Sequence, residues 1–380
     1  MGVRRRVSDG SDEPMGSLIV QYRGLRTKKF AGASCTSLLC ALLFFVAAPV
    51  WPGQVDEPLK AALDLHESGK VKEAIQEYDK VIKAQPRLAE AYFNRGNAYY
   101  DLEQYQQAIK DYGQAIRLNP KDAEAYYNRG NAYRRLKQDA AALNDYGAAI
   151  KLNQDDARSY TNRGSIHFDA RRYEAAVKDF TEAIRIDAND AQNYYNRGNS
   201  YLALDKKQEA IADYDAALGR DPKLIDAHYN RGIAHAESNN YDNAISDFDE
   251  VLRLNPKSAE ALYNRGLAKM KLARYDEAIE DYSEAMRLNP KDPEAPFNRG
   301  LAYLRINKYD YAARDFSEVI GMQPKNADAF VYRGIIRTYQ GKEKDAEADF
   351  QKAFQLNPAL KKKLQPIIDE AKARAKERYK

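Results

Sequence analysis

The stretch YYNRGNAYRRL, Tyr126–Leu136, is one copy of a pattern that recurs along most of this 380-residue chain. Its triplet Asn-Arg-Gly begins at seven positions spaced 34 residues apart: Asn94, Asn128, Asn162, Asn196, Asn230, Asn264 and Asn298. One step further on, the chain keeps Arg333 and Gly334 but has Tyr332 in place of Asn. A fixed period of this length without insertions is typical of stacked helical units rather than of a single globular core. We therefore predict an all-α solenoid.

Each unit is expected to contain two antiparallel helices. In residues 89–122, we predict the first helix from Ala89 to about Leu102 and the second from about Tyr105 to Leu118. Asn119-Pro120 ends the second helix, because proline cannot donate to the preceding turn. In every unit from 89 onwards, a glycine is followed twelve residues later by alanine and then, four residues on, by an aromatic residue. The two small residues are expected to let the helices of a pair approach closely, beside the large ring.

This spacing resembles the tetratricopeptide repeat (TPR), whose fold is a right-handed superhelix of antiparallel helix pairs. The resemblance covers nine units: 55–88, 89–122, 123–156, 157–190, 191–224, 225–258, 259–292, 293–326 and 327–360. The first unit keeps Ala74, Tyr78 and Pro86 but has Ala62 in place of glycine, and we interpret it as an N-terminal cap. The family resemblance implies a module that binds proteins or peptides.

Residues 361–380 are predicted to form a basic capping helix. An apolar stripe, formed by Leu360, Leu364, Ile367, Ile368, Ala371 and Ala375, is expected to cover the open end of the last unit. Pro366 lies within this stretch and predicts a kink or a break in the helix.

The N-terminal segment 1–54 is basic at first and then apolar, with its most apolar part at Leu38–Ala48. This order predicts a signal peptide or a membrane anchor, and the notably basic flank places the repeats on the extracytoplasmic side, the periplasm in a bacterium. Whether the segment is cleaved, and whether translation begins at Met1 or Met15, stays open at this level. The two cysteines, Cys35 and Cys40, both lie here, so the repeats contain no disulfide.

An arginine and an aspartate recur sixteen residues apart in eight units. The arginine lies in the first helix and the aspartate in the second, at similar heights on either side of the turn near Glu103, so we predict a structural ion pair within each hairpin or to the adjacent unit. The pairs are Arg95–Asp111, Arg129–Asp145, Arg163–Asp179, Arg197–Asp213, Arg231–Asp247, Arg265–Asp281, Arg299–Asp315 and Arg333–Asp349. Binding of an anionic ligand by these arginines is the alternative.

The seven triplet asparagines face away from the partner helix and are predicted to line a concave groove. Their carboxamides could pair with the backbone of an extended protein or peptide ligand, as in the Asn-lined grooves of some TPR proteins. An aromatic row lies beside them and is predicted to line the same groove: Phe93, Tyr127, Tyr195, Tyr229, Tyr263 and Phe297. Hydrogen bonding between neighbouring units is the alternative role of the asparagines.

Composition and motifs favour a non-catalytic protein. Residues 57–360 carry 45 Lys/Arg and 49 Asp/Glu, which argues against a basic nucleic-acid-binding face. His228 and His235 are seven residues apart on one predicted helix, too far apart to share a metal, and no phosphate-binding or nucleophile motif is present. We predict a binding scaffold without cofactor, metal or small-molecule substrate, used in cell-envelope complex assembly. The alternative is a structural module that self-associates through its ends or convex surface.

Overall fold

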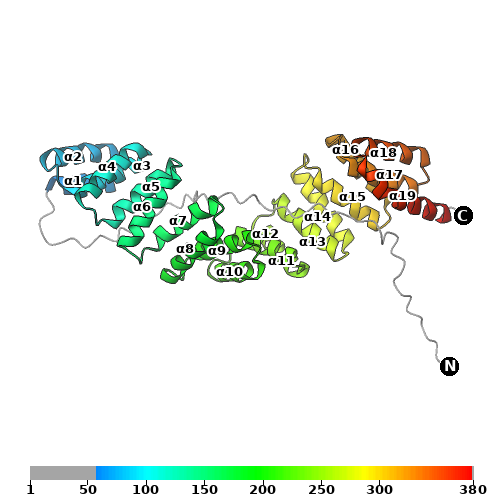
Figure 1. Cartoon of the computed structure of the whole chain (residues 1–380), viewed down its shortest axis with the longest axis horizontal. Coiled ribbons are helices and arrows are strands. Elements are labelled where there is room, and N and C mark those ends of the chain that lie inside the picture. Colours follow the sequence, from blue (N-terminus) through cyan, green and yellow to red (C-terminus); the bar gives the residue numbers. More distant parts are fainter. Residues whose placement is uncertain (1–56, 379–380) are drawn as a thin grey trace, which may run out of the picture. The chain divides into compact units, whose positions relative to one another are not determined.

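The computed structural model describes residues 57–378, which form helices and no strands (Figure 1). The helices are α1 (Glu57–Glu67), α2 (Val71–Ala84), α3 (Ala89–Asp101), α4 (Tyr105–Leu118), α5 (Ala123–Arg135), α6 (Asp139–Leu152), α7 (Ala157–Asp169), α8 (Tyr173–Ile186), α9 (Ala191–Ala203), α10 (Lys207–Arg220), α11 (Ile225–Glu237), α12 (Tyr241–Leu254), α13 (Ala259–Lys271), α14 (Tyr275–Leu288), α15 (Glu294–Arg305), α16 (Tyr309–Met322), α17 (Ala327–Tyr339), α18 (Glu343–Leu356) and α19 (Ala359–Arg378). The prediction of an all-α solenoid of helix pairs is confirmed. We number the nine pairs repeats 1 to 9.

The described residues divide into two compact units, residues 57–227 and residues 228–378. In each unit, the two helices of a repeat pack against each other, and the second helix packs against the first helix of the next repeat, as α3, α4 and α5 do. Among the helices of residues 57–378, none is both long enough and apolar enough to span a membrane. The predicted signal or anchor segment 1–54 lies outside the described residues.

The turn inside each repeat has a left-handed residue at a fixed position. In repeat 2 this residue is Glu103, with φ 58°, and the N–H groups of Glu103 and Gln104 return to the carbonyl oxygens of Tyr100 and Tyr99 at 2.9 and 2.8 Å. This pairing is a Schellman motif, which satisfies the last carbonyls of the first helix. Positive φ recurs at Lys137, Arg171, Asp205, Asn239, Ala273 and Asn307, whereas glycine occupies the position only at Gly69 and Gly341.

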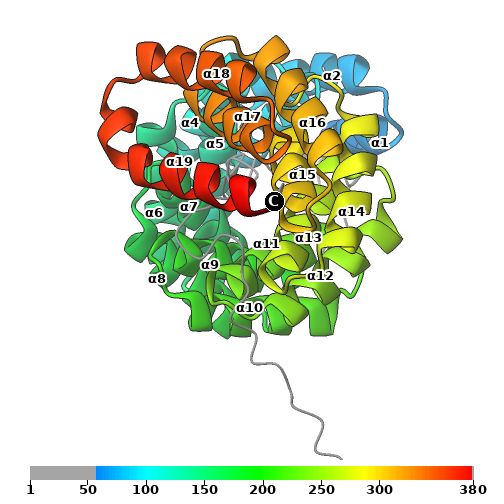
Figure 2. The same ribbon diagram turned by 90° about the vertical axis from the view of Figure 1, so that its right-hand side faces the viewer.

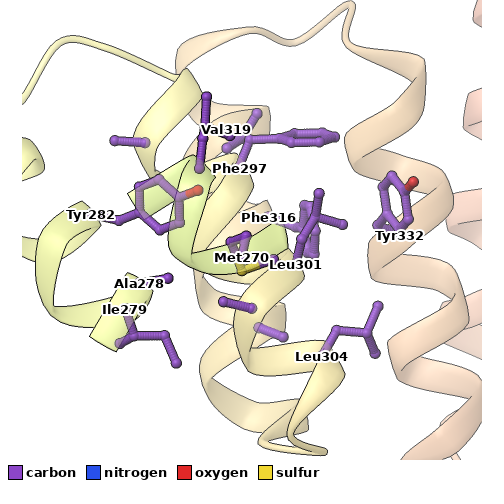
Figure 3. Packing of buried hydrophobic residues seen from close by; sticks show 14 of the residues in the cluster. Met270, Ala278, Ile279, Tyr282, Phe297, Leu301, Leu304, Phe316, Val319 and Tyr332 are labelled. Atoms are coloured by element: carbon purple, nitrogen blue, oxygen red, sulfur yellow. The ribbon is translucent and has the colours of Figure 1, made fainter. Parts of the chain in front are cut away.

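The small and large residues of the repeat meet in the interior of each helix pair. A Cβ atom added at Gly96 would lie 2.8 Å from two ring atoms of Tyr112, and Ala108 and Tyr112 are fully or almost fully buried. The predicted close approach of the two helices is therefore present. Figure 3 shows the same type of interior further along the chain, where Tyr282 of α14, Phe316 of α16 and Tyr332 of α17 gather with aliphatic side chains.

Helix α19 covers the end of repeat 9. It lies beside α17 (Figure 2). Its Ile368, Ala371 and Ala375 are buried in one cluster with Phe330 and Ile335 of α17. Of the predicted kink or break at Pro366, the break is wrong, because α19 runs from Ala359 to Arg378 with Pro366 inside it. Apolar packing of the residues after Pro366 outweighs the hydrogen bond that proline cannot make.

Candidate ligand-binding face

Hydrogen bonds between asparagine side chains link successive repeats in residues 57–227. Asn97 Oδ1 accepts a hydrogen bond from Asn128 Nδ2 of the next repeat at 3.1 Å and another from the Tyr112 hydroxyl of its own repeat at 2.8 Å. The same arrangement recurs one repeat further on. There, Asn131 Oδ1 accepts hydrogen bonds from Asn162 Nδ2 at 3.0 Å and from the Tyr146 hydroxyl at 2.7 Å. We call these side chains the carboxamide network. It fixes the orientation of Asn128 and Asn162 on the first helices.

The carboxamide network leaves hydrogen-bond acceptors available. The Nδ2 groups of Asn128 and Asn162 donate within the network, whereas their Oδ1 atoms have no hydrogen-bond partner among the described residues. Both side chains, and that of Asn94, are partly exposed. An amide oxygen is an acceptor only. This face can therefore accept hydrogen bonds from N–H groups, such as those of a peptide backbone.

The predicted ladder of seven asparagines is wrong for repeats 5 to 8. Asn196, Asn230, Asn264 and Asn298 are all buried, with Asn264 and Asn298 at 0 % exposure. Asn264 Nδ2 donates to the Tyr229 hydroxyl at 3.0 Å, and Asn298 Nδ2 donates to the Tyr263 hydroxyl at 2.7 Å. These bonds join each repeat to the preceding one, which is the alternative role that the sequence left open. Only Asn94, Asn128 and Asn162 remain accessible members of the row.

The aromatic row also differs from its predicted role. Tyr229, Tyr263 and Phe297 are at most 1 % exposed, so they belong to the interior rather than to a groove. Each ring of the row packs on the aromatic ring of the second helix in its repeat: Phe93 on Tyr112 (5.9 Å between centroids), Tyr127 on Tyr146 (5.9 Å), Tyr195 on Tyr214 (6.1 Å), Tyr229 on Phe248 (5.9 Å), Tyr263 on Tyr282 (5.8 Å) and Phe297 on Phe316 (5.3 Å). Phe93, Tyr127 and Tyr195 are partly exposed, so only these three border the face.

The structure brings together all eight predicted Arg–Asp pairs. In repeat 2, Arg95 donates from Nε and Nη2 to Asp111 Oδ2 and Oδ1, both at 2.7 Å. The other pairs have their closest atoms at 2.6–2.7 Å: Arg129–Asp145, Arg163–Asp179, Arg197–Asp213, Arg231–Asp247, Arg265–Asp281, Arg299–Asp315 and Arg333–Asp349. All eight aspartates are buried. The hydrogen bond to Asp145 raises the pKa of Arg129, and burial raises the pKa of Asp315 against the opposing effect of Arg299.

These arginines also reach the preceding repeat, through an acceptor sixteen residues earlier that the sequence reasoning missed. Arg95 Nη1 donates to Asp79 Oδ1 at 2.5 Å, and Arg299 Nη1 donates to the Ser283 hydroxyl at 2.9 Å. The other bonds of this kind run from Arg197 to Thr181, Arg265 to Asp249 and Arg333 to Ser317. A polar residue at that spacing is the signal that could have predicted them. Because its partners are protein side chains, the arginine row holds repeats together and is not an open anion site.

The part of the chain that the structure describes contains no group of three or more His, Cys, Asp or Glu side chains that could hold a metal ion. His228 Nδ1 lies 3.4 Å from Asp247 Oδ1, next to the Arg231–Asp247 pair. We find no arrangement of a nucleophile and a base on the face described above.

Family models and solved structures match the chain over most of the described residues. A model described as TPR repeat matches residues 62–103, 96–137, 130–170 and 164–205, and one described as Tetratricopeptide repeat matches residues 195–259, 229–293 and 297–360. Among curated proteins, none matches the chain.

Three solved structures illustrate the likeness. The C-terminal part of a TPR repeat-containing protein from Cytophaga hutchinsonii is 20% identical, with 62% of this chain and 97% of that chain covered and a TM-score of 0.53. A tetratricopeptide repeat protein from Parabacteroides merdae is 24% identical, with coverage of 67% and 98% and a TM-score of 0.47. YrrB, described as a TPR protein with an unusual peptide-binding site, is 24% identical, with coverage of 48% and 95% and a TM-score of 0.46. At these identities the likeness concerns the fold alone.

Proposed function

The chain belongs to the tetratricopeptide repeat family, a family of protein–protein interaction scaffolds, and from this premise we propose that it binds an extended peptide segment of a partner protein along the first helices of repeats 2 to 4. The observation that carries the proposal is the set of oriented, partly exposed carboxamide oxygens at Asn128 and Asn162. The N–H groups of an extended backbone are the natural donors to such oxygens, whatever the peptide sequence.

Selectivity for particular peptides would come from the charged residues beside the carboxamides. Glu90 and Asp169 are exposed acids on the first helices, and Arg135 is an exposed base. Arg158 is already engaged by Glu124 and Asp156, so it offers less to a ligand. The face thus combines acidic and basic positions at different repeats. A ligand with alternating charges would fit it better than a purely acidic or basic one.

The binding test uses a library of random peptides displayed on phage and selected on the immobilised full chain. We expect the selected peptides to bind at least about tenfold more weakly to a variant with Asn94, Asn128 and Asn162 changed to alanine, equivalent to about 1.4 kcal/mol. A control variant carries Asn144→Ala and Asn243→Ala, two exposed asparagines on second helices. Equal binding to the wild type and the triple variant would exclude this face. If the triple variant instead changes only the mass of the particle in solution, the self-association alternative replaces the proposal.

We also propose that segment 1–54 directs the repeats across a membrane, where they act in assembling a cell-envelope complex. The support is the order of a basic flank and an apolar stretch in the sequence. Intact mass spectrometry of the chain recovered from separated membrane, periplasmic and cytoplasmic fractions would test this. A shortened chain in the periplasmic fraction, or a complete chain in the membrane fraction, supports export. Recovery only from the cytoplasmic fraction contradicts it.

A further inference from the structure

An arginine side chain lies over an aromatic ring on the candidate face of repeat 3. Arg158, the second residue of α7, holds its guanidinium carbon 4.6 Å from the centroid of the Tyr127 ring of α5. It also forms ion pairs with Glu124 of α5 and with Asp156, the latter at 2.7 Å. A ring face beside a carboxylate is a favourable place for a guanidinium or ammonium group. We call the Tyr127 ring and the Glu124 carboxylate the occupied site.

Repeat 2 has the same ring and carboxylate in an almost identical helix. Residues 89–99 (AEAYFNRGNAY) and residues 123–133 (AEAYYNRGNAY) differ only at Phe93 and Tyr127. Both segments begin an α-helix at the equivalent alanine, so the ring and the carboxylate three residues before it lie on the same helix face in both repeats. Phe93 is partly exposed and Glu90 is exposed. We call the Phe93 ring and the Glu90 carboxylate the open site.

The open site has no cation from the chain itself. Arg158 comes 34 residues after Glu124, whereas the residue 34 positions after Glu90 is Glu124, an acid that is already paired with Arg158. Among the described residues, Glu90 has no hydrogen-bond or ion-pair partner, and no arginine or lysine lies over the Phe93 ring. The open site therefore presents the surroundings of a bound cation while the cation itself is left to a ligand.

Within residues 57–378, no further repeat combines an accessible ring with an acid at these positions. Repeats 1, 4 and 9 lack the ring and have Leu59, Thr161 and Val331 in its place. Repeat 5 has Gln192 in place of the acid. In repeats 6 to 8 the rings are at most 1 % exposed: Tyr229, Tyr263 and Phe297. The open site is thus a local feature of repeat 2 and not a consequence of the repeat pattern.

We propose that the open site binds a basic side chain of the peptide ligand. The inference rests on the proposed function, because Phe93 directly precedes Asn94 on α3, so a peptide backbone bound along this face passes the open site. The ligand's cation lies over the Phe93 ring and pairs with Glu90, as Arg158 does in the occupied site. Arginine suits the site better than lysine, because its planar guanidinium stacks on a ring while donating to a carboxylate. An acidic side chain is repelled by Glu90.

The test uses an array of short random peptides, each synthesised once with arginine and once with citrulline, its uncharged isostere, at one central position. Fluorescence anisotropy with the full chain gives the affinity of both members of each pair. We expect arginine peptides to bind about tenfold more tightly, because arginine adds a ring contact and an ion pair. In Glu90→Gln the preference should fall to about threefold, since only the ring contact remains. Glu174→Gln, which removes an exposed acid of α8, is the matched control and should leave the preference unchanged.

Emptying the occupied site gives a second measurement. Arg158→Gln introduces the residue that repeat 5 has at the same position and exposes the Tyr127 ring and the Glu124 carboxylate. Some peptides with two arginines should then bind about tenfold more tightly to this variant than to the wild type, because two sites accept a cation. If no spacing of the two arginines gives such a gain, the occupied site is not a model for ligand binding and the proposal is overturned.

The outcomes separate this proposal from the proposed function. Equal affinity of arginine and citrulline peptides, or a preference that Glu90→Gln does not reduce, overturns the open site and leaves backbone binding intact. If arginine peptides keep their preference and bind the variant with Asn94, Asn128 and Asn162 changed to alanine as well as they bind the wild type, the open site is supported and the backbone contacts are refuted. If no peptide of either kind binds, both proposals are overturned.

Discussion

Residues 57–227 and residues 228–378 are built from the same type of repeat, yet one interior position is polar in the first unit and apolar in the second. Three residues after the triplet asparagine, repeats 2 to 5 have Asn97, Asn131, Ser165 and Asn199, whereas repeats 6 to 9 have Ile233, Leu267, Leu301 and Ile335. The residue on the second helix that faces this position changes as well. In the first unit, Tyr112, Tyr146 and Tyr214 donate hydroxyl hydrogen bonds to the asparagines at 2.7–2.8 Å.

The second unit has mainly phenylalanine opposite the aliphatic residues, namely Phe248, Phe316 and Phe350. A buried hydroxyl without a partner is costly, whereas a fully apolar pair has no hydrogen bond to lose. The two solutions therefore exchange as pairs in most repeats, and repeat 7, where Tyr282 stands opposite Leu267, is an exception in this unit. Repeat 4 follows the same rule, because Ser165 stands opposite Phe180. The comparison shows that the repeats share the same helix geometry, while the polarity of the interior pair differs from repeat to repeat.

The largest expected difference between the units concerns the buried aspartates. Asp281 pairs with two cations, Arg265 at 2.6 Å and Lys269 at 2.8 Å, whereas Asp145 pairs with Arg129 at 2.7 Å. Removing one partner of a buried pair costs about 3 kcal/mol or more, because the remaining charge is uncompensated. We expect Asp281→Asn to lower the free energy of unfolding more than Asp145→Asn does.

Urea unfolding followed by circular dichroism measures both variants. Asp155→Asn is the control, because Asp155 is exposed and its ion pair with Arg185 is long, at 3.7 Å. Equal losses for Asp281→Asn and Asp155→Asn would show that the buried pairs contribute no more than surface charges do.

The exchange of polar and apolar pairs can be tested by transplanting one pair. Phe248→Tyr places a hydroxyl opposite Ile233 in the interior of repeat 6 and is expected to cost about 2 kcal/mol. Adding Ile233→Asn should recover part of that loss, because Asn97 accepts such a hydroxyl in repeat 2. A double-mutant cycle, with each variant unfolded by heat or urea, gives the coupling free energy between the two substitutions. A coupling of zero would refute the claim that these residues exchange as pairs.

Turn chemistry separates the first and last repeats, which have glycine at the left-handed position, from repeats 2 to 8, which do not, and its expected effect is smaller. Ala273 in repeat 7 has φ 56°, whereas the equivalent position in repeat 1 is Gly69 with φ 79°. A left-handed conformation costs roughly 1–2 kcal/mol for an ordinary L-residue, and glycine avoids that cost. Ala273→Gly is therefore expected to stabilise the second unit by about 1 kcal/mol, measured by hydrogen exchange in α13 and α14. A matched Gly341→Ala variant should have the opposite effect, and stabilisation by both changes would contradict this account.

The smallest effect on stability is expected in repeat 1, where a tyrosine stands opposite an aliphatic residue instead of an asparagine. Tyr78 is fully buried, stands opposite Leu63 rather than asparagine, and has a hydroxyl with no hydrogen-bond partner among the described residues. Burial raises the pKa of this hydroxyl far above its usual value. Tyr78→Phe should be neutral or stabilise the protein by up to about 1 kcal/mol, whereas Tyr112→Phe should destabilise it by about that amount. Destabilisation by Tyr78→Phe in urea unfolding would indicate an unseen partner for the hydroxyl.

Much of the fold follows from spacing that can be read in the chain. The bounds of α3 and α4, the contact of Gly96 with Tyr112, and the pairing of Arg95 with Asp111 each depend on residues close in sequence and held in regular helices. Regular helix geometry makes such relations calculable from residue number alone. The continuity of α19 through Pro366 was not predictable in this way, because it depends on packing against α17 and α18.

In the candidate site, too, some features follow from the sequence and others depend on packing. The sequence by itself determined the helical repeat, the row of asparagines and the arginine–aspartate pairs, because a 34-residue period returns equivalent residues to equivalent places. Only the tertiary structure decided that Asn128 and Asn162 keep accessible oxygens while Asn264 and Asn298 are buried, and that Arg158 lies over the Tyr127 ring. The physical reason is that exposure and hydrogen-bond partners depend on side chains of neighbouring repeats, which vary while the backbone pattern stays the same.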